Sequence, residues 1–241
     1  MTAVLVHGVP ETTTLWDPLR THLSGNVTTL GMPGFGSPPP DGFEPTMERY
    51  ASWLGDELAA IDGPVDLVAH DWGAILSLKV LADPPDGIRS WALDMGNLDD
   101  DFAWHDLAQV WQTPEAGEAF MEGMLAVSDE ERAGLLIASG VPESGALEMA
   151  AGIDRTMADA ILTLYRSAVD VGRDWGPGID RIGGPGLVIE ATGDAFRAPH
   201  SAARLAERTG AEIATLDGCG HWWMLDDPAG AARVLNEFWA S

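Results

Sequence analysis

The chain has 241 residues, 46% hydrophobic and 21% charged, which is long enough for one large globular domain or for a core domain with an insertion. Thirteen Lys and Arg face 38 Asp and Glu, so the formal net charge is −25. This excess of negative charge disfavours nucleic acid and anionic membranes as partners and favours a neutral or apolar small-molecule substrate. A single cysteine, Cys219, excludes an intramolecular disulfide.

The amino terminus shows no targeting pattern. Its apolar run, residues 3–6, lacks a basic flank and is too short for a signal sequence or a membrane span. We therefore expect a cytoplasmic protein without membrane attachment, either a monomer or a homodimer.

Short apolar runs alternate with segments of helical periodicity along most of the chain. The predicted strands are residues 3–6, 27–30, 65–69, 88–95, 186–191 and 213–216. The predicted helices are residues 15–23, 46–61, 72–81, 199–208 and 228–239. This alternation predicts an α/β fold, with a mostly parallel sheet of about six strands flanked by helices.

Residues 97–180 interrupt the alternation, because their apolar spacing is helical and contains no convincing strand. We interpret them as a helical cap, inserted into a core formed by residues 1–96 and 181–241. Within the insertion, Ser128 followed by three acidic residues predicts a helix start.

Asp71 stands between a predicted strand and a predicted helix, in the sequence Val-Ala-His-Asp-Trp-Gly-Ala at 68–74. Small residues two positions away on each side give the steric pattern of a nucleophile elbow. A carboxylate there attacks carbon and forms an alkyl ester, so ordinary serine esterase chemistry is disfavoured. Asp71 could equally be a helix N-cap, because Asp often accepts backbone N–H bonds at that position.

Asp194 and His221 follow two later predicted strands. With Asp71 they stand in the chain order nucleophile, acid, base. Taken singly, Asp194 could be a turn former and His221 a structural histidine. The backbone N–H groups of Val9 and Trp72 could form an oxyanion hole, although the segment around Val9 could also be an ordinary turn.

Five sequence blocks resemble signatures of the α/β-hydrolase superfamily, and within it those of epoxide hydrolases and haloalkane dehalogenases. They are HGVP at 7–10, GMPGFGS at 31–37, HDWG at 70–73, GD at 193–194 and GCGHW at 218–222. The resemblance implies that Asp71 attacks carbon and that His221, oriented by Asp194, activates the water that hydrolyses the ester. It implies no cofactor, and it suggests that the two leading strands usual in the family are missing here.

The leaving group separates the two subfamilies. In the epoxide hydrolases that the chain resembles, two cap tyrosines protonate the opening ring, and Tyr165 is the one tyrosine in the insertion. His105 could be the second donor or an ordinary surface residue. We predict hydrolysis of a neutral, fairly apolar epoxide, with Tyr165 and His105 as donors.

Two other functions stay open. A haloalkane dehalogenase would use the same nucleophile and hold the halide with the indole N–H groups of Trp72 and a cap tryptophan, such as Trp104, Trp111 or Trp175. Against this, Val9 stands where some dehalogenases carry a halide-binding Asn. The third possibility is a non-catalytic small-molecule receptor with the same fold.

The remaining site expectations concern the pocket wall and metals. We expect His7, Trp104 and Trp111 to line the substrate pocket. No spacing of His, Cys and Asp indicates a metal site.

Overall fold

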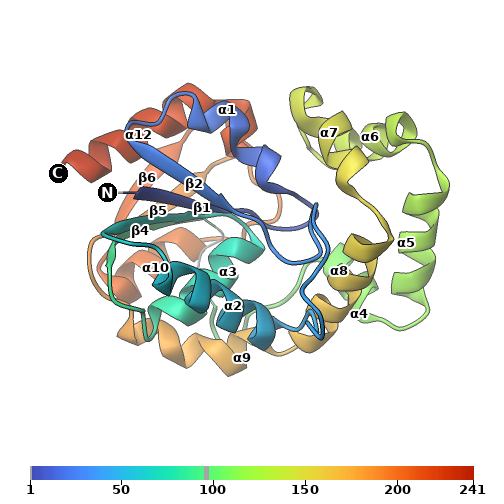
Figure 1. The fold of residues 1–241 in the computed structure, drawn as a ribbon, viewed down its shortest axis with the longest axis horizontal. Coiled ribbons are helices and arrows are strands. Elements are labelled where there is room, and N and C mark those ends of the chain that lie inside the picture. Colours follow the sequence, from blue (N-terminus) through green and yellow to red (C-terminus); the bar gives the residue numbers. More distant parts are fainter. Residues whose placement is uncertain (1, 95–97) are drawn as a thin grey trace.

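The computed structural model describes residues 2–94 and 98–241. Six parallel strands form one sheet in the order β2-β1-β3-β4-β5-β6 (Figure 1). Their bounds are β1 Thr2–Val6, β2 Asn26–Leu30, β3 Val65–Ala69, β4 Ile88–Leu93, β5 Gly186–Ala191 and β6 Glu212–Leu216. The predicted α/β sheet is therefore confirmed. The fourth strand ends at Leu93, and its predicted end at Met95 lies outside the described residues.

Helices cover both faces of the sheet. Figure 1 shows α1 (Asp17–Arg20) and α12 (Pro228–Ala240) on one face, and α2 (Met47–Ala59), α3 (Trp72–Leu81) and α10 (Ser201–Thr209) on the other. The predicted helix at 15–23 is wrong in extent. A 3₁₀ turn, η1 (Thr13–Trp16), precedes the short α1, because Pro18 has no N–H to continue a ladder and instead favours the first turn of a new helix.

The described part of the insertion contains helices and no strand. These elements are α4 Asp106–Gln112, α5 Ala116–Ala126, α6 Asp129–Ala138, α7 Glu143–Gly152, α8 Arg155–Ser167, α9 Val171–Trp175 and η2 Gly176–Arg181. Helices α4 to α8 lie beyond the carboxyl ends of the strands, whereas η2 packs on α3 and α10 of the core (Figure 1). The predicted boundary at 96/97 lies outside the described residues, and the division into core and cap stays a prediction.

The predicted helix start at Ser128 is confirmed as the N-cap of α6. Its hydroxyl accepts the backbone N–H of Glu131, and the Glu131 carboxylate accepts that of Ser128. In the next turn, buried Arg132 donates to carbonyl oxygens of Met124, Val127, Ala150 and Ile153. This one guanidinium therefore ties α6 to the carboxyl ends of α5 and α7.

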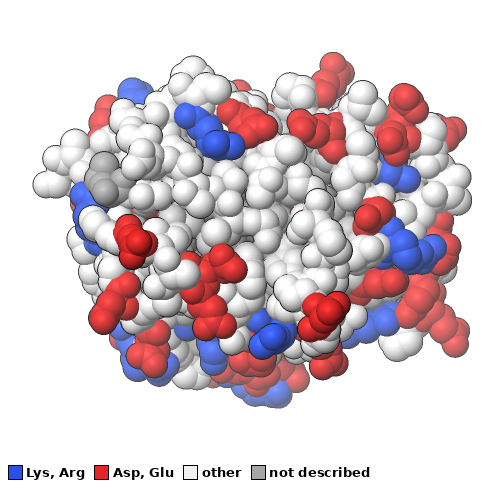
Figure 2. Space-filling view, viewed as in Figure 1, with Lys and Arg blue, Asp and Glu red and all other residues white. Residues whose placement is uncertain are grey.

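Charged side chains are scattered over the surface. Figure 2 shows acidic and basic groups mostly toward the rim of the visible face, with an almost uncharged centre. Among the residues that the structure describes, no helix is both long and apolar enough to cross a membrane.

A short α11 (Trp223–Asp226) follows the last strand and its loop. Because all six strands are parallel, their carboxyl ends lie along one edge of the sheet, directly beneath the helices of the insertion. This edge is the place where polar side chains gather.

Candidate active site

Asp71 lies on the tight turn between β3 and α3, with φ 51° and ψ −120°. Glycine is required on two sides of this turn. A Cβ at Gly73 would lie 2.5 Å from the carbonyl oxygen of Val6, and a Cβ at Gly8 would lie 2.3 Å from Asp71 Oδ1. Asp71 occupies the N-cap position of α3, but its side chain makes no capping hydrogen bond of the kind that the N-cap alternative predicts. The turn has the strained geometry of a nucleophile elbow.

The Asp71 carboxylate is held by backbone N–H groups. Val9 N–H donates to Asp71 Oδ1 over 2.9 Å, and the backbone N–H of Trp72 also bonds to the carboxylate. Both N–H groups predicted for the oxyanion hole therefore contact the Asp71 carboxylate. Burial raises the pKa of Asp71 to about 6, while the nearby His221 opposes this rise and Glu11 adds to it.

His221 joins the two predicted acids. Its Nδ1 donates to Asp194 Oδ2 over 3.0 Å, and its Nε2 lies 3.8 Å from Asp71 Oδ2. Since Asp194 is ionised and acceptor-only, it fixes the proton of the neutral ring on Nδ1 and leaves the lone pair of Nε2 facing Asp71. Burial and the charge of His70 lower the pKa of His221, but Asp194 and Asp71 outweigh them, so that the pKa is raised.

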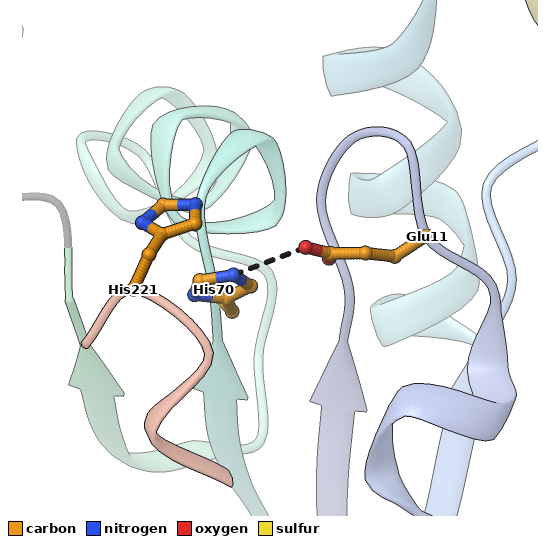
Figure 3. A group of neighbouring side chains, drawn as sticks. All are labelled: Glu11, His70 and His221. Carbon is orange, nitrogen blue, oxygen red and sulfur yellow. Dashed lines mark hydrogen bonds and ion pairs between the residues drawn. The ribbon is translucent and has the colours of Figure 1, made fainter. Parts of the chain in front are cut away.

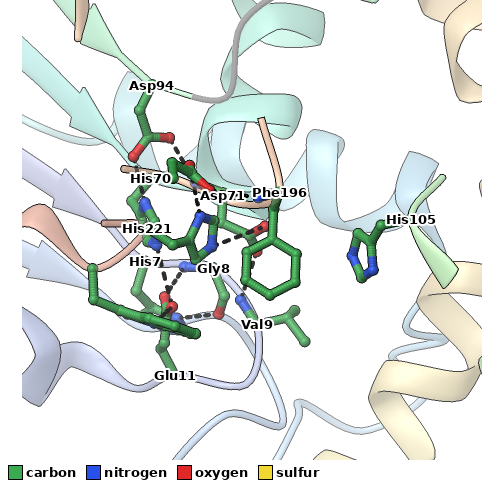
Figure 4. A network of polar contacts seen from close by, with 12 residues as sticks. His7, Gly8, Val9, Glu11, His70, Asp71, Asp94, His105, Phe196 and His221 are labelled. Carbon is green, nitrogen blue, oxygen red and sulfur yellow. Dashed lines mark hydrogen bonds and ion pairs between the residues drawn. The ribbon is translucent and has the colours of Figure 1, made fainter. Parts of the chain in front are cut away.

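Beneath the nucleophile lies a buried chain of charges that was not predicted. His70 Nδ1 bonds to Asp94, and His70 Nε2 lies 3.2 Å from Glu11 Oε1 (Figures 3 and 4). Burial lowers the pKa of His70, but the two carboxylates outweigh it and raise the pKa well above its usual range. Burial opposes ionisation of Glu11, yet His70 lowers its pKa to about 2. His70 is therefore an imidazolium between two carboxylates.

Both carboxylates have further partners. Glu11 Oε2 accepts the backbone N–H of Gly8 over 2.8 Å, and Asp94 Oδ1 accepts the backbone N–H of Asp71 over 2.9 Å. The indole N–H groups of Trp222 and Trp223 donate to Glu11 and Asp94 over 2.8 and 2.6 Å. These two tryptophans follow His221 directly, so the loop that carries the base is anchored to the acids on either side of His70.

Glu11, His70 and His221 also offer ligand atoms within 4.8 Å of one another. Figure 3 shows the three side chains next to each other. Two histidines and a carboxylate are ligands that zinc accepts. However, Glu11 and His70 already bond to each other, and the second nitrogen of each imidazole bonds to a carboxylate. Hydrogen bonds account for these groups, and the expectation of a site without metal stays a prediction.

Above the triad lies a cavity of about 420 Å³ that Asp71 and His221 share with cap residues. Helices α4, α5, α6 and α8 contribute most of its wall, and the carboxyl edge of the sheet contributes Asp71 and His221. The lining residues are mainly apolar: Val9, Pro10, Asp71, His105, Leu107, Trp111, Phe120, Met121, Met124, Leu135, Leu136, Ala138, Ser139, Ile153, Ile161, Tyr165, Phe196, His221 and Trp222.

Two tryptophans and one histidine do not have the positions or contacts that the sequence predicts. His7 and Trp104 are buried behind the cavity wall, and the prediction that they line the pocket is wrong. His7 donates from Nδ1 to the Gly8 carbonyl and accepts the backbone N–H of Met32 at Nε2, which ties the ends of β1 and β2 together. The indole N–H groups of Trp104 and Trp175 donate to Ala168 and Glu48, so neither is free for a halide.

Trp111 does line the cavity, and its buried indole N–H has no hydrogen-bond partner in the described chain. The same holds for the indole N–H of Trp72. Both rings pack edge-on against Tyr165. Burial raises the pKa of Tyr165 well above its usual value, and Asp71 adds to this, while contact with the Trp72 indole offsets a part. The phenol is therefore neutral.

His105 begins α4. Its Nδ1 accepts the backbone N–H of Ala108 over 3.3 Å as the N-cap of the helix. Burial and the nearby His221 lower the pKa of His105, so the ring is neutral. A neutral ring that accepts at Nδ1 carries its proton on Nε2. Figure 4 shows His105 apart from the bonded network, beyond Phe196 and Val9.

Comparison with known proteins agrees with this geometry. The sequence model of a family described as the alpha/beta hydrolase family matches residues 3–234. The chain belongs to the alpha/beta hydrolase family. A haloalkane dehalogenase of Psychrobacter cryohalolentis is 29% identical over 118 residues, which cover 45% of this hydrolase and 38% of that relative. The match thus spans less than two thirds of the relative's length.

Solved structures cover nearly the whole hydrolase at lower identity, and they show the fold alone. Haloalkane dehalogenase DbeA of Bradyrhizobium elkani has a TM-score of 0.77 at 21% identity, covering 99% of this chain and 89% of its own. Cfl2 of Burkholderia cenocepacia has a TM-score of 0.81 at 19% identity, covering 98% and 87%. A bromoperoxidase of Bacillus anthracis has a TM-score of 0.75 at 19% identity, covering 100% and 92%.

The unpredicted acids of this alpha/beta hydrolase had a signal in its sequence. Asp94 directly follows a buried strand, as His70 does, and Glu11 follows the first strand by a short turn. The rule that carboxyl ends of parallel strands meet at one edge, which predicted Asp194, applies equally to them. The rule does not predict which side chains pair, because His70 and His221 could each have bonded to Glu11, Asp94 or Asp194.

Proposed function

We propose that this alpha/beta hydrolase opens a neutral, apolar epoxide to a diol through an alkyl ester on Asp71. One observation carries the proposal. The Tyr165 hydroxyl and the Nε2–H of His105 belong to the wall of the cavity that Asp71 faces, and neither donates to an acceptor among the described residues. Two free donors opposite a carboxylate nucleophile suit a leaving group that stays attached as an alkoxide.

In the first step the Asp71 carboxylate attacks a ring carbon, and the carbon–oxygen bond breaks toward the cap. Tyr165 donates its proton to the ring oxygen, while the His105 N–H stabilises the developing charge. An alkoxide is more basic than a phenolate, so this transfer is favourable even though burial raises the pKa of Tyr165. The product is a hydroxyalkyl ester on Asp71.

In the second step His221 Nε2 removes a proton from water, whose oxygen attacks the ester carbonyl carbon. Asp194 stabilises the imidazolium that forms. The oxyanion that develops on Asp71 is held by the backbone N–H groups of Val9 and Trp72, which already bond to the carboxylate. Collapse breaks the bond between the carbonyl carbon and the diol oxygen, which takes the proton from His221, and the proton left on the Asp71 carboxyl group passes to the Tyr165 phenolate, so that both side chains are restored.

Haloalkane dehalogenation is the second candidate, and a specific observation favours it. The indole N–H groups of Trp72 and Trp111 are buried beside Tyr165 without hydrogen-bond partners in the described chain, as a halide site requires. The same candidate is supported by the relative and the solved structure that are named haloalkane dehalogenases. A departing halide needs no proton, so Tyr165 and His105 would then have no chemical task.

Trapping the ester decides between these functions. A His221→Ala variant is incubated with neutral epoxides and with bromoalkanes, and its intact mass is measured, with an Asp71→Asn, His221→Ala double variant as control. We expect a mass gain equal to the whole epoxide that the control lacks. A gain of bromoalkane minus HBr, without an epoxide adduct, would assign dehalogenation. No adduct from either series would overturn both and favour a binding protein.

A further inference from the structure

We propose that the substrate carries a single uncharged apolar tail of about ten carbon atoms, which lies between α5 and α6 and ends beside Leu135. The inference deepens the proposed function and relies on it for the position of the reactive end at Asp71. It rests on how polar groups, volume and exposure are distributed along the cavity.

The polar groups of the cavity gather at one end. Asp71, His221 and His105 belong to the edge where the core meets α4, and His105 and His221 both contact the ring of Phe196. On α5 and α6 the lining is Phe120, Met121, Met124, Leu135, Leu136 and Ala138, with Ser139 just after the end of α6.

Among the described lining residues, the α5–α6 side carries no charged side chain and no side-chain donor that is free for a substrate. Asp71 is the one Asp, Glu, Lys or Arg in the described lining. The Ser139 hydroxyl donates to the Leu135 carbonyl over 3.1 Å, so it has no further proton to donate to a substrate. A carboxylate or another acceptor on the tail would therefore lose its water without a replacement bond from these side chains, which disfavours binding.

The volume sets the length. A cavity of about 420 Å³ holds about 14 non-hydrogen atoms, if each takes roughly the 30 Å³ of a water molecule in the liquid. An epoxide group accounts for about three of them at the reactive end. About ten carbon atoms remain for the tail.

Exposure gives the direction. Met121 is 3% exposed and lies within the wall, whereas Leu135 lines the same cavity and is 50% exposed. The cavity therefore reaches solvent beside Leu135, away from the buried Asp71 and His221. The part of a tail that is longer than the cavity would extend past Leu135 into water and would add little binding free energy.

The chain offers a matched control for this position. Ile137 lies on the same helix and is 40% exposed, but it does not line the cavity. A cation introduced at Leu135 stands at the end of the proposed tail, and one at Ile137 does not. Leu135→Arg and Ile137→Arg therefore change the net charge of the protein equally, but only Leu135→Arg places a positive charge at the end of the tail site.

The experiment measures kcat/KM for 1,2-epoxyalkanes and 1-bromoalkanes of four to sixteen carbons, and for an eleven-carbon epoxide with a terminal carboxylate. We expect a rise of about fourfold per methylene that levels off near ten to twelve carbons. The carboxylate should lower kcat/KM at least about a hundredfold in the wild type. Leu135→Arg should recover at least about tenfold of this, and Ile137→Arg should not.

Binding without chemistry separates this inference from the proposed function. Tryptophan fluorescence titrations with unreactive 1-alkanols of four to twelve carbons should show the same dependence on length. If alkanols show it but no epoxide or bromoalkane is turned over, the catalytic proposal fails and the tail site stands. If turnover occurs without dependence on length, or if both Arg variants accept the carboxylate equally, the tail site is overturned.

Discussion

The two walls of the cavity differ in how their polar groups are bonded. On the core side, the carboxylates of Asp71, Glu11 and Asp94 accept backbone or indole N–H groups, and His70 bonds to acids on both nitrogens. On the cap side, the donors of Tyr165, His105 and Trp111 have no acceptor in the part of the chain that is described, and apolar side chains surround them.

This difference assigns separate tasks to the two walls. Fully bonded groups cannot reorient without breaking several hydrogen bonds, so the core wall holds the nucleophile, the base and the oxyanion donors in fixed positions. Unpaired donors can still form a hydrogen bond with a bound ligand. Under the proposed function, the core wall would carry out the ester chemistry, and the cap wall would select the leaving group and the substrate. Each of the following predictions tests that division.

The largest effect should come from the core wall. Asp71→Asn removes the nucleophile while preserving an oxygen for the Val9 N–H, and Asn tolerates the positive φ of 51°. We expect turnover to fall by at least about 10⁴-fold for every substrate. Steady-state rates with epoxides and bromoalkanes check this. Residual turnover above a hundredth of the wild type would mean that another group attacks carbon.

The same variant should be more stable than the wild type at high pH. The pKa of Asp71 is raised in the fold to about 6, so its ionisation opposes folding: stability is present below the unfolded pKa and is lost as the pH rises through 6. Asn should therefore raise stability by about 1 to 3 kcal/mol at pH 8 and by little at pH 4. Urea unfolding at both pH values measures the change in stability. Equal changes at pH 4 and pH 8 would contradict a raised pKa of Asp71.

A cap variant should distinguish leaving groups. Tyr165→Phe removes the proton donor while its ring still packs against Trp72 and Trp111. We expect kcat for epoxides to fall by about 10² to 10³-fold, and bromoalkane turnover to change by less than about threefold. Trp111→Phe serves as the reciprocal variant. Equal losses with both substrate types would show that Tyr165 acts through packing, and the division of tasks would then fail.

Glu11→Gln should have a smaller effect that falls on the second step. The amide loses one charge beside His70 but can still accept the Gly8 N–H. Because Glu11 lies next to His221 and not next to the cap donors, hydrolysis of the ester should slow by about 10 to 100-fold while its formation changes little. Intact mass during turnover should show accumulated ester. A slower first step instead would place Glu11 in the attack on carbon.

The smallest effect is that of pH on the wild type. Since the pKa of Asp71 is about 6, the attacking carboxylate is protonated in acid. We expect kcat/KM to fall by about tenfold for each pH unit below 6, and to be flat just above it. A pH series with a neutral substrate tests this. A fall that begins near pH 4 would show that Asp71 has an ordinary pKa and that the core wall does not perturb it.

The sequence alone was sufficient to predict the strands of the sheet and the meeting of Asp71, Asp194 and His221 at one edge of it. Short apolar runs predicted the strands from local sequence, and small residues around Asp71 predicted a tight turn at a strand-to-helix junction. Because parallel strands end at a common edge, the order of strands along the chain already brought Asp71, Asp194 and His221 together.

Only the tertiary structure decided which groups are paired. Trp104, Trp111 and Trp175 look alike in sequence, yet contacts from distant segments leave only Trp111 unbonded. His7 and His70 each stand beside a motif, but His7 bonds to backbone and His70 to two acids. Strands and turns follow from local chemistry, whereas hydrogen-bond pairing and burial depend on residues far apart in the chain, and these determine which donors remain for a substrate.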